Sequence, residues 1–408
     1  MADSSPAADP PDNAPPGDAF YAPPILPAGG QHGDPVWQRP LDNPAAVLAD
    51  GDCWLVLYQS QDAQGNPIAT SGIVALPSAP PPAGGYPVVS WAHGTVGVAS
   101  LCAPSRDQPG SSAHPMNAYP QTLLNALLQQ GYAVTMTDYE GLGTTDRRHP
   151  YLLGASEAHG VLDIVRNARC LFGSRISGQF AIAGHSQGGQ AALFAAHFAP
   201  DWTPELDLAG VAAIAPANHP LALVQAGAAS AATNPGYAFT PLFLSGAIGG
   251  DPGIDPAQVL SPGAFATNWP QVDQRCRAGL SQTDSWGGLQ GIQQFAAGYP
   301  AAPNAHQQRF NQQLAQMNPA VTLTAPARVT QAADDERVYA NPAPLPGTDT
   351  LIQEINAANS ATGNTVTYQR YPAGTVPPDP TLGVHFATIN YDLQALISWL
   401  GPLFTPPD

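Results

Sequence analysis

Residues 180–193 contain the feature that most restricts how this chain can fold. An apolar stretch typical of a β-strand ends in the motif Gly-His-Ser-Gln-Gly at residues 184–188, and an alanine-rich stretch typical of a helix follows. A turn with glycine on both sides of Ser186 can be tight enough to hold the serine hydroxyl clear of a sheet. The alternative is an ordinary strand-to-helix turn with a capping serine. We interpret Ser186 as a candidate nucleophile.

A nucleophilic serine in such a turn needs an acid and a histidine base, which follow it along the chain in that order. Of ten histidines, only His385 lies beyond residue 306. We expect His385 in a loop rich in proline and glycine, between a strand at 365–370 and a helix at 387–402. A lone histidine in a loop is more often a solvated surface residue, but the chain order favours His385 as the base.

The acid should end a strand between the serine and the histidine. A β-type stretch near 326–331 breaks into an acidic turn that contains Asp334 and Asp335. We prefer Asp335, because many hydrolases of this kind carry a glutamine and a valine at the spacing of Gln331 and Val338. Asp334 remains the alternative, and either carboxylate could simply be solvated or cap the turn.

An oxyanion hole needs two backbone N–H groups, one of which belongs to the residue after the nucleophile, here Gln187. A buried strand near 87–92 runs into His-Gly-Thr, and the N–H of Thr95 or Val96 could supply the second donor. His93 precedes Ser186 in the chain, so we interpret it as a residue that orders this loop and not as the base.

These segments together resemble the secretory lipases of the α/β-hydrolase superfamily that are related to fungal lipase A. The resemblance spans most of the chain from about residue 50 and rests on residues 91–95, 101–105, 131–143, 149–152 and 184–189. It implies a triad of Ser186, Asp335 and His385, an ester substrate, and a helical cap over the site.

Four cysteines lack the Cys-x-x-Cys spacing of a zinc or redox site. An even count in an extracellular enzyme suggests two disulfides, whereas four free thiols would suit a cytosolic protein. Three pairings are possible. The resemblance favours Cys102 with Cys276, which leaves Cys53 with Cys170.

Charge and hydropathy exclude several classes of partner. The chain has 13 Lys+Arg against 30 Asp+Glu, a net charge of -17, and all its basic residues are arginines. Nucleic acids need basic patches, and no apolar run is long enough to cross a membrane, so we expect neither nucleic-acid binding nor an integral membrane segment. Histidines and cysteines do not cluster at ligand spacing, so we expect no metal and no cofactor.

The alternation of strand-like and helix-like segments predicts a mostly parallel central sheet, and the resemblance implies that this sheet belongs to an α/β-hydrolase fold. The strand pattern breaks between about 217 and 320, so we expect an inserted, mainly helical cap there. Strands are expected near 53–58, 70–76, 87–92, 132–137, 179–184, 209–215, 326–331 and 365–370. We expect a disordered or extended N-terminal arm at 1–35, without the apolar stretch of a signal peptide. Core segments at 36–216 and 321–408 should flank a cap or lid at 217–320. Phe239, Leu242 and Phe243 are candidates for an acyl pocket in this cap, although such residues are more often core.

The sequence therefore predicts a secreted serine carboxylic-ester hydrolase, a lipase or carboxylesterase, that works through an acyl-enzyme. A polyesterase, and a peptidase or acyltransferase with the same triad, are alternatives. A non-catalytic binding module is disfavoured by the ordered serine, acid and histidine.

Overall fold

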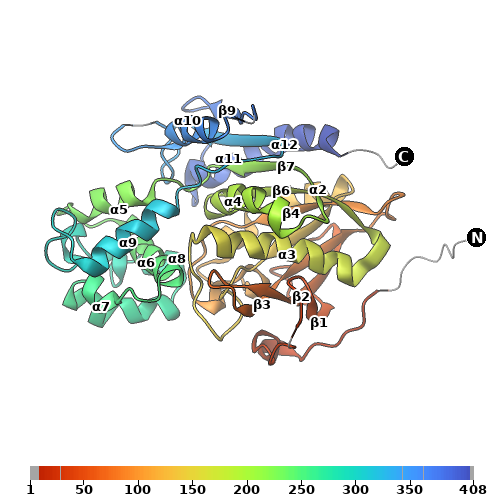
Figure 1. The fold of residues 1–408 in the computed structure, drawn as a ribbon, viewed down its shortest axis with the longest axis horizontal. Coiled ribbons are helices and arrows are strands. Elements are labelled where there is room, and N and C mark those ends of the chain that lie inside the picture. The colour runs from red at the N-terminus through yellow and green to blue at the C-terminus, as the bar shows by residue number, and fades with distance from the viewer. Residues whose placement is uncertain (1–8, 28, 342, 362, 405–408) are drawn as a thin grey trace, which may run out of the picture.

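A nine-stranded mixed sheet lies at the centre of the part of the chain that the computed structural model describes, residues 9–27, 29–341, 343–361 and 363–404 (Figure 1). The spatial order is β1-β2-β3-β5-β4-β6-β7-β8-β9. The first three pairings in this order are antiparallel and the remaining five are parallel. The strands are β1 (Pro35–Pro40), β2 (Gly51–Gln61), β3 (Pro67–Pro77), β4 (Tyr86–Ala92), β5 (Ala133–Thr137), β6 (Ile176–His185), β7 (Asp207–Ile214), β8 (Ala327–Ala332) and β9 (Thr367–Tyr371).

Twelve α-helices occur in the same described ranges. They are α1 (His114–Ala118), α2 (Gln121–Gln129), α3 (Gly154–Phe172), α4 (Gln187–Trp202), α5 (Pro220–Ala228), α6 (Phe239–Gly250), α7 (Pro256–Val259), α8 (Arg277–Leu280), α9 (Ala305–Gln316), α10 (Thr348–Ala358), α11 (Gly383–Tyr391) and α12 (Leu393–Leu400). The predicted α/β fold with a mostly parallel sheet is confirmed.

The central strands are buried on both faces. Successive residues of a strand point to opposite sides of the sheet, yet all five residues of β5 are buried, as are Ala181, Ile182 and Ala183 in β6. Parallel strands of this kind need helices on both faces. The helix α3 packs on β2, β4, β5 and β6, and α4 packs on β4, β6 and β7, which fixes the position of the turn at Ser186.

A second hydrophobic cluster lies to one side of the sheet. It consists mainly of apolar residues between 224 and 317, joined by Val98, Tyr151 and Leu152. Figure 1 shows the helices that carry it, α5 to α9, gathered beside the strands. This segment corresponds to the expected cap, and its action as a lid stays a prediction.

Two local expectations differ from the structure. The expected helix at 387–402 is two helices, and the first of them begins at Gly383, so His385 lies in the first turn of α11 and not in a loop. The strand β1 was not expected; its proline at each end weakens the strand pattern, but it pairs with β2 at the edge of the sheet, where proline is tolerated.

The described part of the expected N-terminal arm packs on the core. Phe20 and Tyr21 are buried, and the Tyr21 hydroxyl lies 2.9 Å from Ser105 Oγ. These two aromatic side chains supply apolar area that holds this stretch of the expected disordered or extended arm against the core. Residues 1–8 of that arm lie outside the described residues.

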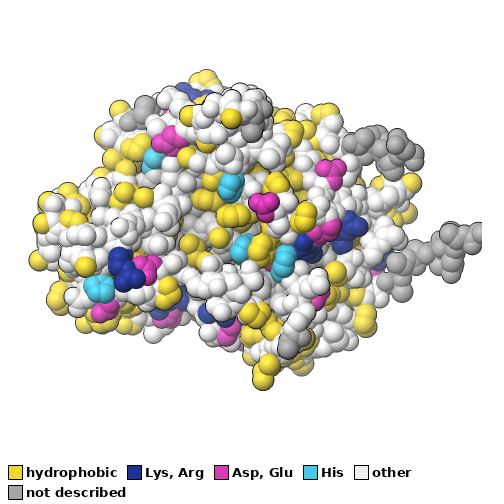
Figure 2. All heavy atoms as spheres, in the orientation of Figure 1, with side chains coloured by type: hydrophobic (Ala, Val, Ile, Leu, Met, Phe, Trp, Pro, Cys, Tyr) yellow, Lys and Arg dark blue, Asp and Glu magenta, His cyan; other side chains and the backbone are white. Residues whose placement is uncertain are grey.

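Charged side chains are scattered over the visible face, most of which is apolar or neutral, in keeping with 11% charged residues (Figure 2). Of the helices in the described ranges, none combines the length and the apolar character needed to cross a membrane.

Candidate active site

Ser186 sits in a strained turn between β6 and α4. Its backbone has φ 59° and ψ -118°, a conformation that residues other than glycine rarely adopt. The Ser186 N–H donates to the carbonyl of Ile214 at 2.9 Å, and the Ser186 carbonyl accepts from Gln190 at 3.1 Å and from Ala217 at 2.9 Å. These hydrogen bonds hold the strained residue at the carboxyl edge of the parallel strands.

The glycines on either side of Ser186 are required by close packing. A Cβ atom at Gly184 would collide with the carbonyl oxygen of Gly188, and a Cβ at Gly188 would collide with the carbonyl oxygen of Ala92 at the end of β4. Only glycine lets the start of α4 approach β4 and β6 this closely.

The structure brings Asp335 and His385 together. His385 Nδ1 lies 2.8 Å from Asp335 Oδ2, and both side chains are buried. Asp335 Oδ1 accepts the backbone N–H groups of Arg337 at 2.8 Å and Val338 at 2.9 Å, so the carboxylate has a fixed orientation. The neighbouring Asp334 instead accepts the N–H of Gly374 and lies on the exposed side of the turn.

Two further residues, which the sequence analysis did not identify, fix the position of His385. His185 Nε2 lies 3.0 Å from the carbonyl oxygen of His385, and the two rings are 4.4 Å apart. Burial holds the pKa of His185 well below its usual range, so this ring is neutral and Nε2 is the donor. Glu336 Oε2 accepts the backbone N–H groups of Val384 at 3.0 Å and His385 at 3.2 Å.

Ser186 and His385 line the same cavity of about 80 Å³. No hydrogen bond joins Ser186 Oγ to the His385 ring within the described residues, as is common before a substrate is bound. The remaining lining is mainly apolar and consists of Thr95, Tyr151, Leu152, Ala217, Asn218, His219, Pro220, Leu223, Phe239, Phe243, Arg277, Arg337, Val338, Tyr339, Leu345, Pro346 and Phe386.

Of the three expected oxyanion donors, Thr95 lines this cavity, whereas Gln187 and Val96 do not. Gln187 is the first residue of α4, and the first N–H groups of a helix have no partner within the helix. Thr95 lines the cavity, and its hydroxyl lies 2.8 Å from the Tyr151 hydroxyl. Val96 is buried and does not belong to the cavity lining; its carbonyl accepts the N–H of Arg277 at 2.8 Å. Thr95 is therefore the better of the two candidates.

The loop after β4 at residues 93–96, which carries two of the expected oxyanion donors and is called the oxyanion loop below, contacts buried polar residues. The Tyr139 hydroxyl donates to the carbonyl of His93 at 3.0 Å, and the two rings are 4.4 Å apart. Asp138 Oδ1 accepts the N–H of Ser105 at 3.0 Å, which links two of the segments on which the family resemblance rests, 101–105 and 131–143. His93 is buried and does not belong to the cavity lining.

A buried hydrogen-bond network around the Gln187 side chain was not identified in the sequence analysis. Gln187 Nε2 donates to Glu157 Oε1 at 2.7 Å and lies 2.8 Å from His149 Nε2. Glu157 Oε1 also accepts the N–H of Leu152 at 2.8 Å. The fully buried position of Glu157 within a helical pattern is not recognisable without the fold.

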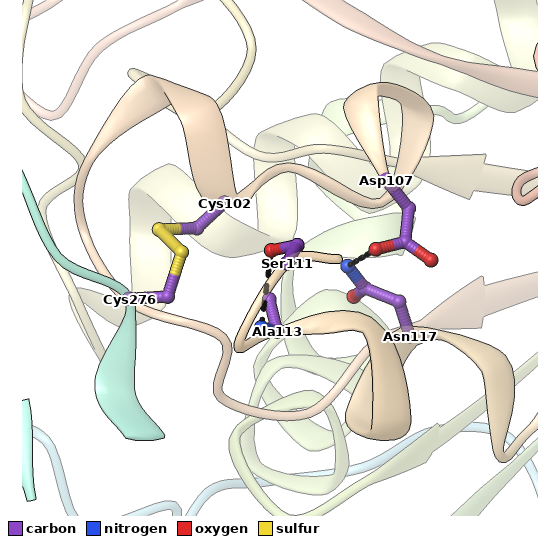
Figure 3. The surroundings of a disulfide bond; sticks show 6 residues. All are labelled: Cys102, Asp107, Ser111, Ala113, Asn117 and Cys276. Atoms are coloured by element: carbon purple, nitrogen blue, oxygen red, sulfur yellow. Dashed lines mark hydrogen bonds between the residues drawn. A yellow bond between two sulfur atoms is a disulfide. The ribbon is translucent and has the colours of Figure 1, made fainter. Parts of the chain in front are cut away.

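The structure contains the Cys102–Cys276 disulfide that the resemblance implies. It joins the loop after β4 to the segment that leads into α8, 174 residues later (Figure 3). The expected Cys53–Cys170 pairing is wrong, because both thiols are free. Cys53 lies on β2 with its sulfur 3.3 Å from the N–H of Leu48, whereas Cys170 is exposed near the end of α3. An even cysteine count alone therefore misled the prediction.

Of the three candidate acyl-pocket residues, Phe239 and Phe243 line the cavity and Leu242 does not. Phe239 and Phe243 are four residues apart on α6 and share one face of the helix. Leu242 is fully buried in the second hydrophobic cluster, so its assignment to the pocket is wrong. Across the described part of the chain, no three histidine, cysteine or acidic side chains are grouped to hold a metal ion.

The sheet order, the strained turn and the position of the site at the strand ends define an α/β-hydrolase. Within this class, residues 114–231 match the family model described as Secretory lipase, in agreement with the resemblance seen in the sequence.

Three relatives match over part of their length. Lipase 7 of Candida albicans is 29% identical over 202 residues, which cover 48% of this chain and 46% of the relative. Lipase A of Moesziomyces aphidis is 25% identical over 202 residues, 47% of this chain and 41% of the relative. A probable inactive lipase of Mycobacterium tuberculosis is 27% identical over 201 residues, 47% of this chain and 44% of the relative. The chain thus matches less than half the length of each relative.

Solved structures share the fold over nearly the whole chain. Candida antarctica lipase A in its closed state has a TM-score of 0.70 at 19% identity, covering 88% of this chain and 82% of that chain. The rice cell wall degrading esterase LipA from Xanthomonas oryzae has a TM-score of 0.67 at 22% identity, covering 90% and 97%.

Proposed function

We propose that this chain is a serine carboxylic-ester hydrolase of the lipase or carboxylesterase type. The observation that carries the proposal is the 2.8 Å contact between His385 Nδ1 and buried Asp335, in a cavity that the strained Ser186 also lines. The family match supports ester substrates and, with the disulfide, supports secretion.

In the proposed mechanism His385 removes the Ser186 proton as the serine oxygen attacks the ester carbonyl, and Asp335 stabilises the imidazolium that forms. The N–H groups of Gln187 and Thr95 hold the oxyanion. The alcohol leaves after protonation by His385, and water then hydrolyses the acyl-enzyme by the same steps. The helical segment 217–320 acts as a cap, since α6 contributes Phe239 and Phe243 to the cavity.

The first experiment is the hydrolysis of nitrophenyl esters from short to long acyl chains, as dissolved monomers and as emulsions. Ser186→Ala serves as the blank and should lose nearly all turnover while its circular dichroism spectrum is unchanged. Preference for long chains in emulsion favours a lipase, and preference for short soluble chains favours a carboxylesterase or a polyesterase.

One relative carries the description of a probable inactive lipase, so catalytic competence needs its own measurement. A serine-directed phosphonate should label the wild-type protein at Ser186 and leave Ser186→Ala unlabelled. A protein that resists the phosphonate and hydrolyses no ester would be a binding module. Labelling together with amide cleavage or acyl transfer, but without ester hydrolysis, would favour the peptidase or acyltransferase alternative.

A further inference from the structure

Arg277 is a positive charge at the candidate active site without an acidic partner. Within the described ranges, 11 of the 13 arginines form ion pairs with carboxylates, and only Arg169 and Arg277 do not. The Arg277 guanidinium contacts weak acceptors instead: Nη2 lies 3.1 Å from the sulfur of Met116, and Nη1 lies 3.4 Å from Ser281 Oγ.

This arrangement is unusual for a chain with a net charge of -17, in which carboxylates are plentiful. Burial and the nearby Arg337 lower the pKa of Arg277 to about 10, so the group is still charged at neutral pH. A charge held in a mainly apolar cavity without a counter-ion is costly unless it is used to bind something.

The backbone places Arg277 firmly. The residue follows Cys276 of the disulfide, and its N–H donates to the Val96 carbonyl of the oxyanion loop at 2.8 Å. Its Cζ atom lies 5.9 Å from the centre of the Phe239 ring. The side chain therefore keeps a fixed position relative to the reacting serine.

Arg337, the other guanidinium in the cavity, is already neutralised. Its Nε lies 3.4 Å from Glu336 Oε1, and its Nη2 donates to the Leu382 carbonyl at 3.0 Å. Glu336, the acidic residue that lines the neighbouring cavity, also takes the N–H of Val384, so its charge is balanced locally. Arg277 remains as the uncompensated charge.

A second cavity of about 520 Å³ adjoins the first. The two share seven lining residues, among them Phe239, Phe243 and Arg277, so a substrate bound at Ser186 can extend from one into the other. The shared walls combine aromatic surface for a hydrocarbon segment with one unpaired guanidinium.

We propose that Arg277 forms a subsite for a free carboxylate of the substrate, which makes half-esters of dicarboxylic acids a preferred substrate class. The inference rests on the proposed ester hydrolysis at Ser186. The planar guanidinium can donate two parallel hydrogen bonds to a carboxylate, and the connecting carbon chain lies against Phe239 and Phe243.

The test compares 4-nitrophenyl half-esters of succinic to suberic acid with neutral 4-nitrophenyl esters of the same chain length. The ratio of kcat/KM for the charged over the neutral ester should fall about tenfold or more in Arg277→Gln. In Arg277→Lys this ratio should fall less, because the positive charge is kept. Arg169→Gln is the matched control, because it removes the same charge from an arginine that lines a separate cavity. An unchanged ratio in Arg277→Gln, or an equal fall in Arg169→Gln, would overturn the subsite.

A binding measurement separates this inference from the proposed catalysis. Calorimetry with Ser186→Ala protein should find tighter binding of monomethyl adipate than of dimethyl adipate, and a second change, Arg277→Gln, should abolish the difference. Equal binding of the two adipates refutes the subsite whether or not the wild-type protein is active. Failure of hydrolysis with a persisting preference for the monoester refutes only the proposed catalysis.

Discussion

Gln331 Nε2 donates a hydrogen bond to Asp335 Oδ2 at 3.0 Å, the same carboxylate oxygen that lies 2.8 Å from His385 Nδ1. The same amide nitrogen also donates to the Val338 carbonyl at 3.1 Å, and Gln331 Oε1 accepts from the Thr348 hydroxyl at 2.9 Å. The Gln331 side chain therefore contacts both Asp335 and Val338. The two residues whose spacing favoured Asp335 in the sequence, Gln331 and Val338, are thus hydrogen-bonded to each other in the structure.

We expect Gln331→Leu to lower kcat about tenfold, because a loosened Asp335 no longer orients the imidazole, with a smaller change in KM. The pH dependence of kcat should also shift, which loss of folding alone would not cause. Gln369→Leu, on the exposed face of the neighbouring strand β9, is the control. Equal kinetic effects of the two changes would contradict the role of Gln331.

Asp335→Asn should lower kcat by about 10³- to 10⁴-fold, since an amide holds the histidine in the wrong tautomer and cannot stabilise the imidazolium. Asp334→Asn should leave kcat nearly unchanged, because Asp334 only accepts the N–H of Gly374. Steady-state kinetics on both variants decides between the two acids, and a larger loss in Asp334→Asn would reverse the assignment.

Replacing both Cys102 and Cys276 by serine should lower the free energy of unfolding by about 2–5 kcal/mol, because the bond closes a long loop in the unfolded chain. Urea denaturation of the oxidised protein and the variant measures this difference. Replacing Cys53 and Cys170 together should have a small effect. Alkylation of the unreduced, unfolded wild-type protein should modify Cys53 and Cys170 only, and labelling at Cys102 would contradict the bond.

His93 should make the stability depend on pH. Burial lowers the pKa of His93 from 6.5 to about 4, so the unfolded chain binds a proton more readily between these values. The stability contributed by the neutral, buried His93 ring is fully present above pH 6.5. It is lost as the pH falls towards 4, which lowers the free energy of unfolding by up to about 3 kcal/mol.

His93→Phe removes this titration and keeps the ring that packs on Tyr139. The fall in unfolding free energy between neutral and acidic pH should become shallower, as measured by urea denaturation at several pH values. The control His197→Gln changes a partly exposed histidine on α4 and should keep the wild-type slope. A wild-type slope in His93→Phe would contradict the prediction.

Local sequence patterns predicted much of the fold, because the residue repeats of strands and helices extend over only a few positions. The eight strands expected from alternation are present, and the turn at Ser186 is visible in five consecutive residues. The position of His385 depended only on chain order, which explains why the residue was identified although the start of α11 was missed. The packing of Phe20 and Tyr21 on the core was not predicted, because a few aromatic residues, and not average composition, determine whether a segment packs.

The missed site residues share one property, since their roles arise from contacts between distant segments. His185 contacts His385 across 200 positions, and Arg277 reaches the cavity from a four-residue helix that no periodicity identifies. A missing counter-ion is also invisible in a sequence, because it depends on where all the carboxylates lie.

The 174-residue separation between Cys102 and Cys276 sets an order of events during synthesis. Ser186 and the strands on either side of it leave the ribosome before Cys276, so β1 to β7 can assemble while the loop after β4 is not yet cross-linked. The covalent bond closes only when most of the helical segment has been made. A chain that stops short of residue 276 would therefore carry Ser186 and lack both the bond and Arg277.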